Sequence, residues 1–249
     1  MDGIRFLNAG EQGLVVEFGA SIDPDLNRRV HSTAALVGAA GIPGVREVVP
    51  TYRSLLIYFD PLAITRRQLA ENVRALVADT GAGQAEMSAK VIEIPVAYGG
   101  EHGPDLDFVA GHTGLASEEV VAIHTSVPYL VYMLGFTPGF PYLGGMSERI
   151  AAPRLVQPRT AIPGGSVGIA GAQTGIYPVA SPGGWRIIGR TPVKLFDPGA
   201  AKPFLFAAGD YLQFKAVSAA DYAAIGAQVA AGGYKPVIRN AADKGGEKQ

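Results

Sequence analysis

The sequence predicts an α+β protein in which a small α+β unit precedes a larger unit built around a closed or nearly closed β-barrel. Two observations support this prediction. The first 80 residues alternate between apolar runs typical of strands and segments with helical spacing. Residues 135–192 instead contain 12 glycines and 8 prolines among 58 residues, a density that excludes long helices and leaves short apolar pieces between turns.

The elements of the first unit follow from its apolar spacing. Leu14–Phe18 is an apolar run between glycines, which predicts a buried strand. Asp25–Val37 carries apolar residues at helical spacing and ends at Gly38, which predicts a helix. Two β-rich runs and a second helix follow, and that helix opens with a Thr-Arg-Arg-Gln capping box. The two runs and the capping box are Val45–Pro50, Ser54–Phe59 and Thr65–Gln68.

The predicted domain boundary is Thr80–Lys90, because this segment is small, polar and aperiodic. It gives a first domain over residues 1–84, a second over residues 90–240 and a frayed tail over residues 241–249. In the second domain Ser117 is predicted to be the N-cap of a helix, with two acidic residues after it. The other predicted elements are strands at Lys90–Val96, Val167–Ala170, Trp185–Ile188, Lys194–Phe196 and Tyr211–Val217, and helices at Pro104–Ala110 and Ala219–Ala231.

Composition narrows the classes of function. The hydrophobic share is 48%, the charged share 17% and the net charge −1, so no basic field would attract nucleic acid. Cysteine is absent, which excludes disulfides, cysteine-ligated zinc and thiolate catalysis. No signal-peptide pattern opens the chain, and no apolar run approaches the roughly 20 residues that span a bilayer. We expect a cytoplasmic protein with neither nucleic acid nor a membrane as a partner.

Familiar catalytic motifs are accidental or missing. Gly164-x-Ser166-x-Gly168 looks like the serine elbow of a hydrolase, but the glycines and proline after it cannot form the required helix. All four histidines also precede Ser166, so we interpret this serine as a turn residue. The sequence contains neither a Walker-type phosphate loop nor a His-Glu-x-x-His metal spacing.

Arginines and aromatic residues mark a candidate site in the glycine-rich region. Residues 135–192 contain five arginines and a single acid, Glu148, so a concave surface here would suit a small anionic ligand or an acidic partner. The alternative is that several arginines donate to loop carbonyls. Five aromatic residues lie within residues 129–145, mostly beside or one residue from a glycine or proline, and some are predicted to line a groove or an interface. The alternative is an aromatic minicore beneath a long loop.

Three long strings resemble one family. "YMLGFTPGFPYLGG", "PRLVQPRTAIPGGSVGIAGAQTGIYPVASPGGWRIIGRTPVKLFDP" and "IPVAYGGEHGPDLDFVA" resemble the family that includes KipI, allophanate hydrolase subunit 1 and the B subunit of 5-oxoprolinase. "VREVVPTYRSLLIYFDP" also fits the N-terminal domain of this family, so the resemblance covers nearly the whole chain. One departure is visible: the family would have Pro-Ala-Gly-Ser where this chain has Pro163-Gly-Gly-Ser166, which loosens the turn.

The resemblance implies a ferredoxin-like N-terminal domain, a cyclophilin-like β-barrel C-terminal domain, and a homologous larger partner such as KipA or the C subunit of 5-oxoprolinase. Within this family our first hypothesis is the B subunit of an ATP-dependent 5-oxoprolinase, which works with the A and C subunits on a small anionic substrate. Because the chain lacks an ATP loop and a convincing catalytic triad, we expect it to be inactive alone. The alternatives are a KipI-type histidine kinase inhibitor and a carboxyltransferase subunit of a urea carboxylase or allophanate hydrolase. Genes for the A and C subunits beside this one would favour the first, and a biotin carboxylase gene the last.

This resemblance, together with the arginines and aromatic residues, places an expected groove between the loop Phe136–Tyr142 and the region Arg154–Arg190. His124 is the candidate for proton transfer because its unperturbed pKa near 6.5 suits that role; the alternative is a helix C-cap. Gln173 and Thr174 are candidates to polarise or orient a carbonyl, and Arg159 or Arg190 to hold a carboxylate. The full set of predicted substrate-binding residues is Phe136, Phe140, Tyr142, Arg154, Arg159, Thr174, Tyr177 and Arg190.

Overall fold

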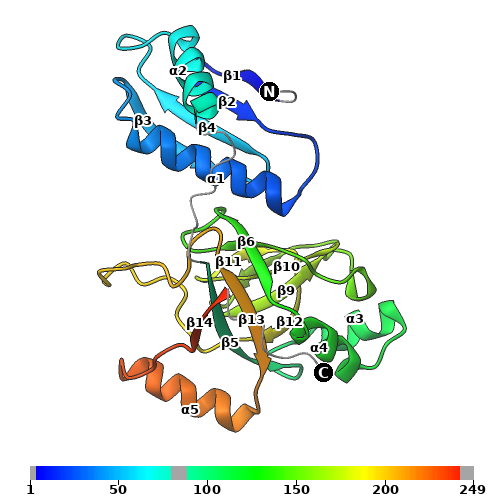
Figure 1. The fold of residues 1–249 in the computed structure, drawn as a ribbon. Coiled ribbons are helices and arrows are strands. Elements are labelled where there is room, and N and C mark those ends of the chain that lie inside the picture. Colours follow the sequence, from blue (N-terminus) through cyan, green and yellow to red (C-terminus); the bar gives the residue numbers. More distant parts are fainter. Residues whose placement is uncertain (1–3, 80–88, 242–249) are drawn as a thin grey trace. The chain divides into compact units, whose positions relative to one another are not determined.

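The computed structural model describes residues 4–79 and 89–241. The chain divides into two compact units, residues 1–87 and 88–249 (Figure 1). The segment 80–88 of the predicted boundary and the segment 242–249 of the predicted tail lie outside the described residues. In the described part of the chain, the helices are too short or too polar to cross a membrane.

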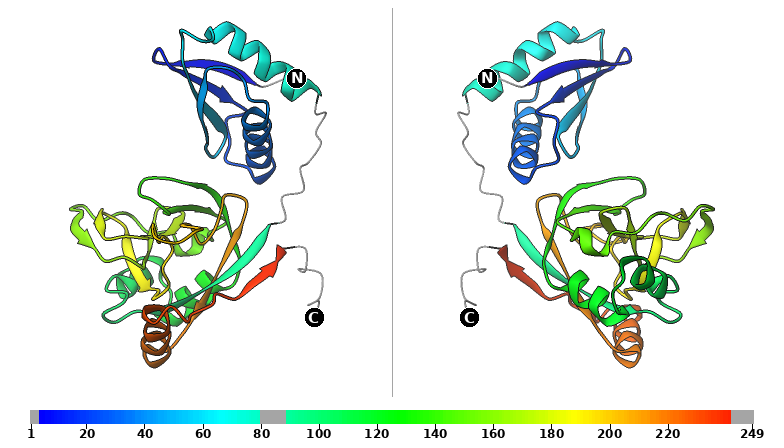
Figure 2. Two further views of the ribbon diagram at one scale, coloured as in Figure 1. Left: turned by 90° about the vertical axis from the view of Figure 1, so that its left-hand side faces the viewer. Right: turned by 90° about the vertical axis from the view of Figure 1, so that its right-hand side faces the viewer.

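The first unit is a four-stranded antiparallel sheet with the order β1-β2-β4-β3, and both of its helices pack on one face (Figures 1 and 2). Alternate side chains of β2 and β4 point into a core shared with both helices, as expected of a half-buried sheet. The predicted strands and helices of this unit are confirmed. Its elements are β1 (Arg5–Ala9), β2 (Gly13–Glu17), α1 (Pro24–Ala39), β3 (Val45–Pro50), β4 (Ser54–Phe59) and α2 (Arg66–Asp79).

Local sequence signals position these helices. The backbone N–H of Gln68 donates to Oγ1 of Thr65 at 3.3 Å, and the N–H of Thr65 donates to Oε1 of Gln68 at 3.1 Å. The predicted capping box is therefore confirmed. Strand β1 has no counterpart in the prediction, because it is a largely exposed edge strand without a clear apolar alternation.

The second unit is built on one large sheet with the order β10-β9-β12-β5-β13-β6-β7, with β14 added beside β5. The two end strands, β10 and β7, contact each other, so the sheet is a nearly closed barrel, as predicted. A separate pair, β8 (Arg159–Ile162) and β11 (Ser181–Gly183), flanks it. The strands of the large sheet are β5 (Lys90–Tyr98), β6 (Tyr129–Leu134), β7 (Pro141–Gly144), β9 (Ser166–Ala170), β10 (Gln173–Ile176), β12 (Arg186–Arg190), β13 (Tyr211–Ala216) and β14 (Ile238–Asn240).

The helices of this unit differ in detail from the prediction. Ala116, and not Ser117, is the N-cap of α4, and its N–H donates to Oε2 of Glu119 at 2.8 Å. Ser117 instead donates its hydroxyl to Asp107 on the preceding helix. The prediction of a strand at Lys194–Phe196 is wrong, because this segment forms only an isolated β-bridge between Phe196 and Phe204. The helices are α3 (Leu106–Thr113), α4 (Ser117–Thr125), the 3₁₀ turn η1 (Glu148–Ile150) and α5 (Ala219–Ala230).

Ser166 does not form a nucleophile elbow. It begins β9, and this strand turns at Gly171 directly into its antiparallel partner β10, so no helix follows the serine. Its side chain is buried. The interpretation of the Gly-x-Ser-x-Gly pattern as accidental is confirmed by this topology.

Candidate functional site

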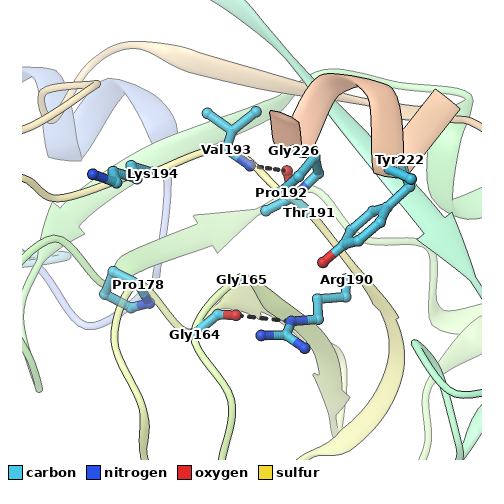
Figure 3. A pocket seen from close by; sticks show the side chains of 11 residues that line it. Gly164, Gly165, Pro178, Arg190, Thr191, Pro192, Val193, Lys194, Tyr222 and Gly226 are labelled. Carbon is cyan, nitrogen blue, oxygen red and sulfur yellow. Dashed lines mark hydrogen bonds between the residues drawn. The ribbon is translucent and has the colours of Figure 1, made fainter. Parts of the chain in front are cut away.

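A cavity of about 430 Å³ opens between the barrel and helix α5 (Figure 3). Four segments supply its walls: the turn before β9, the loop after β10, the end of β12 with the loop that follows, and α5. Among the described residues, the lining includes two cationic side chains and no acidic one. The lining residues are Gly164–Gly165, Pro178, Arg190–Lys194, Tyr222–Ala223 and Gly226.

The turn at one wall of this cavity requires glycine. Gly165 has φ +84°, and a Cβ atom there would lie 2.2 Å from the carbonyl oxygen of Thr191. The turn is held on both sides, since Gly165 N–H donates to Tyr177 O at 2.7 Å and Thr191 N–H donates to Gly165 O at 2.9 Å. The backbone at position 165 can therefore approach the end of β12 only without a side chain.

The two cations of the cavity are held differently. Nε of Arg190 donates to the carbonyl oxygen of Gly164 at 3.0 Å, which fixes the plane of the guanidinium. Lys194 is more loosely placed: its side chain is 64% exposed and its Nζ lies 3.9 Å from Oδ2 of Asp197. The ring of Tyr222 packs against His102 with centroids 4.2 Å apart and the planes tilted by 36°, so α5 is anchored to the loop after β5.

Arg159 is engaged by a buried acid. Asp105 accepts hydrogen bonds from Nη1 and Nη2 of Arg159 at 2.8 and 3.0 Å, and from the backbone N–H of Ile187 at 2.7 Å. The Asp105 side chain is 9% exposed and that of Arg159 34%. Such a bidentate pair ties α3 to β8 and β12, and it occupies the fork that was predicted to hold a substrate carboxylate.

The sequence leaves two roles open for the arginines of the glycine-rich region: binding an anion, or donating to loop carbonyls. The remaining arginines support both roles. Arg186 donates to the carbonyl oxygen of Pro153 at 3.2 Å, and its guanidinium lies 3.5 Å from the ring centroid of Phe108. Arg154 is exposed and, like Arg159, its positive charge counters the rise that burial causes in the pKa of Tyr177. Several of these arginines therefore bind loop carbonyls, while Arg190 both does so and lines the cavity.

His124 lies in the interior of the barrel. Its Nδ1 is 2.8 Å from the hydroxyl of Tyr98, its Nε2 is 2.8 Å from Oγ1 of Thr174, and its ring stacks on Phe214. Because the Thr174 hydroxyl donates to Gly168 O at 3.1 Å, it accepts from Nε2–H, and Nδ1 accepts from Tyr98.

The ordinary pKa that makes histidine suitable for proton transfer is lost at His124 in the folded chain. Burial lowers the pKa of His124 to about 3, so its imidazole is neutral at pH 7. Its side chain is fully buried and caps no helix carbonyl; the C-cap of α4 is Ser126.

Gln173 and Thr174 point to opposite faces of the barrel wall. Neighbouring side chains of a strand alternate, and Thr174 and Ile176 face the core inside the barrel. Gln173 is therefore on the same face as Gly175, against which Phe140 and Trp185 pack. The two residues, each a candidate to act on a carbonyl, thus lie on opposite faces of the strand and do not share one site.

The four predicted aromatic residues form one cluster together with Trp185. Phe140 lies at its centre, with ring centroids 5.4–5.7 Å from its neighbours and mostly edge-to-face geometry. Phe140 and Tyr177 are 2% exposed, whereas Phe136 is 64% exposed and has φ +64°. The minicore alternative therefore describes the cluster's centre, and Phe136 is its exposed edge. The members are Phe136, Phe140, Tyr142, Tyr177 and Trp185.

Sequence reasoning missed three contributors to these sites. Asp105 follows Pro104 at the start of α3, and an acid at a helix start was the available signal. Lys194 and Tyr222 carried no signal, because their place beside Arg190 depends on how α5 packs. Among the described residues, no group of three or more His, Asp or Glu side chains could hold a metal ion.

The chain matches the family described as carboxyltransferase domain, subdomain C and D, over residues 4–206. The B subunit of 5-oxoprolinase from Bacillus subtilis is 44% identical over 227 residues, which cover 86% of this chain and 92% of that protein. The B subunit of 5-oxoprolinase from Escherichia coli O157:H7 is 40% identical, covering 86% and 96%. The crystal structure of TTHA0988 has a TM-score of 0.73 at 38% identity, and the match covers 83% of this chain but only 40% of that one.

Proposed function

Because this chain belongs to the family of carboxyltransferase domains, subdomains C and D, we propose that it is the B subunit of an ATP-dependent 5-oxoprolinase. That enzyme opens the cyclic amide of 5-oxo-L-proline to give L-glutamate. The observation that carries the proposal is the 44% identity to a 5-oxoprolinase B subunit over 92% of that protein. The cationic cavity beside α5 is compatible with an anionic substrate of this kind.

We propose further that the chain acts only within a complex that also contains the A and C subunits, of which the second is larger and homologous to this chain. Neither a Walker-type loop nor, in the described residues, a metal-holding cluster of acids is present, so ATP is assigned to the assembled complex. The cytoplasm, where ATP is supplied, is the proposed compartment. Within the chain, Gln173 and Arg190 remain candidates for substrate contact.

The test is reconstitution from purified components. This chain alone should release no glutamate from 5-oxoproline, and the chain mixed with the A and C subunits should release it with matched hydrolysis of ATP. A correctly assembled complex that leaves 5-oxoproline intact would contradict the proposal. If the complex instead transfers a carboxyl group from carboxyl-biotin, the carboxyltransferase alternative replaces it.

For His124 we propose a positioning role in place of proton transfer. Its imidazole fixes Thr174, and with it the hairpin β9–β10 that carries Gln173. In the assembled complex, His124→Gln should lower turnover without moving the pKa values of the pH–rate profile. Loss of one limb of that profile would show that His124 itself transfers a proton.

The two units are proposed to be separate domains over residues 1–84 and 90–240. A ferredoxin-like fold for the first is supported by its ββαββα order, which is that of a βαββαβ unit whose last strand has moved to the start. A cyclophilin-like fold for the second is supported by its nearly closed barrel. Each segment expressed alone should unfold in one cooperative transition; a gradual loss of structure would contradict this.

A further inference from the structure

A 5-oxoprolinase must hold the carboxylate of its substrate while the cyclic amide reacts. We propose that the cavity between the Gly164–Gly165 turn and α5 is the carboxylate-binding site for this small cyclic amide, with Arg190 as the residue that holds the carboxylate. This inference rests on the proposed function, and it selects Arg190 over the second candidate, Arg159.

The first argument is the state of each guanidinium. Both Nη atoms of Arg159 already bind Asp105, and Arg186 is packed on Phe108 within 4.0 Å of the same acid. In the described part of the chain, no carboxylate lies within ion-pair distance of Arg190, and its one hydrogen bond uses Nε. Its Nη1 and Nη2 atoms therefore keep N–H donors for a planar, bidentate carboxylate.

The second argument is the surrounding charge. The lining contains Arg190 and Lys194 but no aspartate or glutamate, so an anion entering the cavity meets two positive charges. Asp197 offsets the charge of Lys194 only weakly, because the two groups are 3.9 Å apart and their side chains are 47% and 64% exposed. Figure 3 shows the hydroxyl of Tyr222 turned towards Arg190, where it can donate a further hydrogen bond to an anion.

The third argument is how the space is kept open. Gly226 lies in the middle of α5 and faces Pro192, and a Cβ atom there would meet Cβ of Pro192 at an ordinary 3.7 Å. The helix therefore has room for a Cβ atom at this position, whereas a longer side chain would take volume from the cavity beside it. The cavity therefore depends on Gly226 for its size and not for the conformation of the helix.

The experiment measures equilibrium binding of 5-oxoproline to the full chain, alone and in the complex with the A and C subunits without ATP. Three variants are compared with the wild type: Arg190→Gln, Gly226→Leu and the control Arg149→Gln. Arg149 is exposed on η1 and outside the cavity, so its replacement removes the same charge from the same unit. Two further ligands identify what the site recognises. The neutral carboxamide of 5-oxoproline tests whether the site binds the cyclic amide and not the carboxylate, and inorganic phosphate tests whether it is a phosphate site.

We expect Arg190→Gln to raise Kd at least tenfold, equal to about 1.4 kcal/mol. Gly226→Leu should abolish binding while circular dichroism stays unchanged, and Arg149→Gln should leave Kd within about twofold of the wild type. The carboxamide should bind at least tenfold more weakly than the acid.

Unchanged Kd in both cavity variants would overturn the inference, as would equal binding of the carboxamide or tighter binding of phosphate. Failure of the wild type to bind 5-oxoproline in either form would overturn it too. The complex could show no turnover of 5-oxoproline while the cavity variants still bind it more weakly than the wild type. That result would contradict the proposed function but would support the carboxylate-binding site.

Discussion

Nε2 of His124 on α4 lies 2.8 Å from Oγ1 of Thr174 on β10, across the interior of the barrel and 50 residues away in sequence. The Thr174 hydroxyl donates in turn to the carbonyl oxygen of Gly168, and the Tyr98 hydroxyl donates to Nδ1 of His124. Every polar hydrogen in this chain of bonds has an acceptor, so the buried network is satisfied and the imidazole remains neutral.

The first prediction concerns acid stability. The pKa of His124 is about 3 in the folded protein against an ordinary value of 6.5, so the unfolded state binds more protons between these values. The stabilisation that neutral His124 gives the folded state is complete above about pH 6.5 and is lost as the pH falls towards 3. In this range the free energy of unfolding falls by up to about 1.4 kcal/mol per pH unit.

Urea unfolding of wild type and His124→Gln at pH 4.5 and 7 measures that contribution. The variant should be less stable at pH 7 and should lose less stability between the two pH values. His112→Gln, which replaces an exposed histidine, should retain the wild-type difference. An identical pH dependence in His124→Gln and wild type would show that this imidazole is not buried in its neutral form.

The second prediction concerns the pair of Asp105 and Arg159. Asp105→Ala should lower the free energy of unfolding by about 2–3 kcal/mol, because it leaves a half-buried guanidinium and the Ile187 N–H without their acceptor. Glu71→Gln, which breaks the exposed pair with Arg67, should cost only about 0.3–0.5 kcal/mol. Chemical denaturation measures the free energy of unfolding of both variants. Equal losses of stability in the two would contradict a structural role for Asp105.

The third prediction concerns the turn at the cavity wall. Gly165→Ala should be strongly destabilising, by more than about 2 kcal/mol, because positive φ and contact with the Thr191 carbonyl oppose any Cβ atom. Gly171→Ala is the matched control: it has φ +58° with nothing within 4 Å, so only the conformational cost of about 1–2 kcal/mol applies. Thermal unfolding should show a larger loss of stability in Gly165→Ala than in Gly171→Ala. Equal losses would argue against a close contact between a Cβ atom at position 165 and the Thr191 carbonyl oxygen.

The fourth prediction concerns α5. Gly226→Ala should raise the free energy of unfolding by about 0.5–1 kcal/mol, because alanine is the better helix former and its Cβ meets no close contact. Gly38→Ala near the end of α1 offers a comparison in the other unit, with an equally open site. A destabilised Gly226→Ala variant would mean that α5 packs more closely on Pro192 than a 3.7 Å approach allows.

Most elements of the first unit were determined by sequence alone. Apolar spacing placed β2, β3, β4 and both helices of the first unit, because alternation and helical periodicity are properties of neighbouring residues. The glycine and proline density of residues 135–192 likewise excluded long helices and indicated the barrel. The rejection of the serine elbow followed from the same local reasoning.

The chemistry of the candidate site was decided only by tertiary structure. A pKa depends on desolvation and on charges brought from distant segments, and nothing near His124 in sequence indicates that the barrel will bury it. Asp105 meets Arg159 across 54 residues and occupies its guanidinium, whereas Arg190 meets α5 and a glycine turn instead. These arginines are equivalent in sequence, and packing alone decides that Arg159 binds an acid while Arg190 lines the cavity.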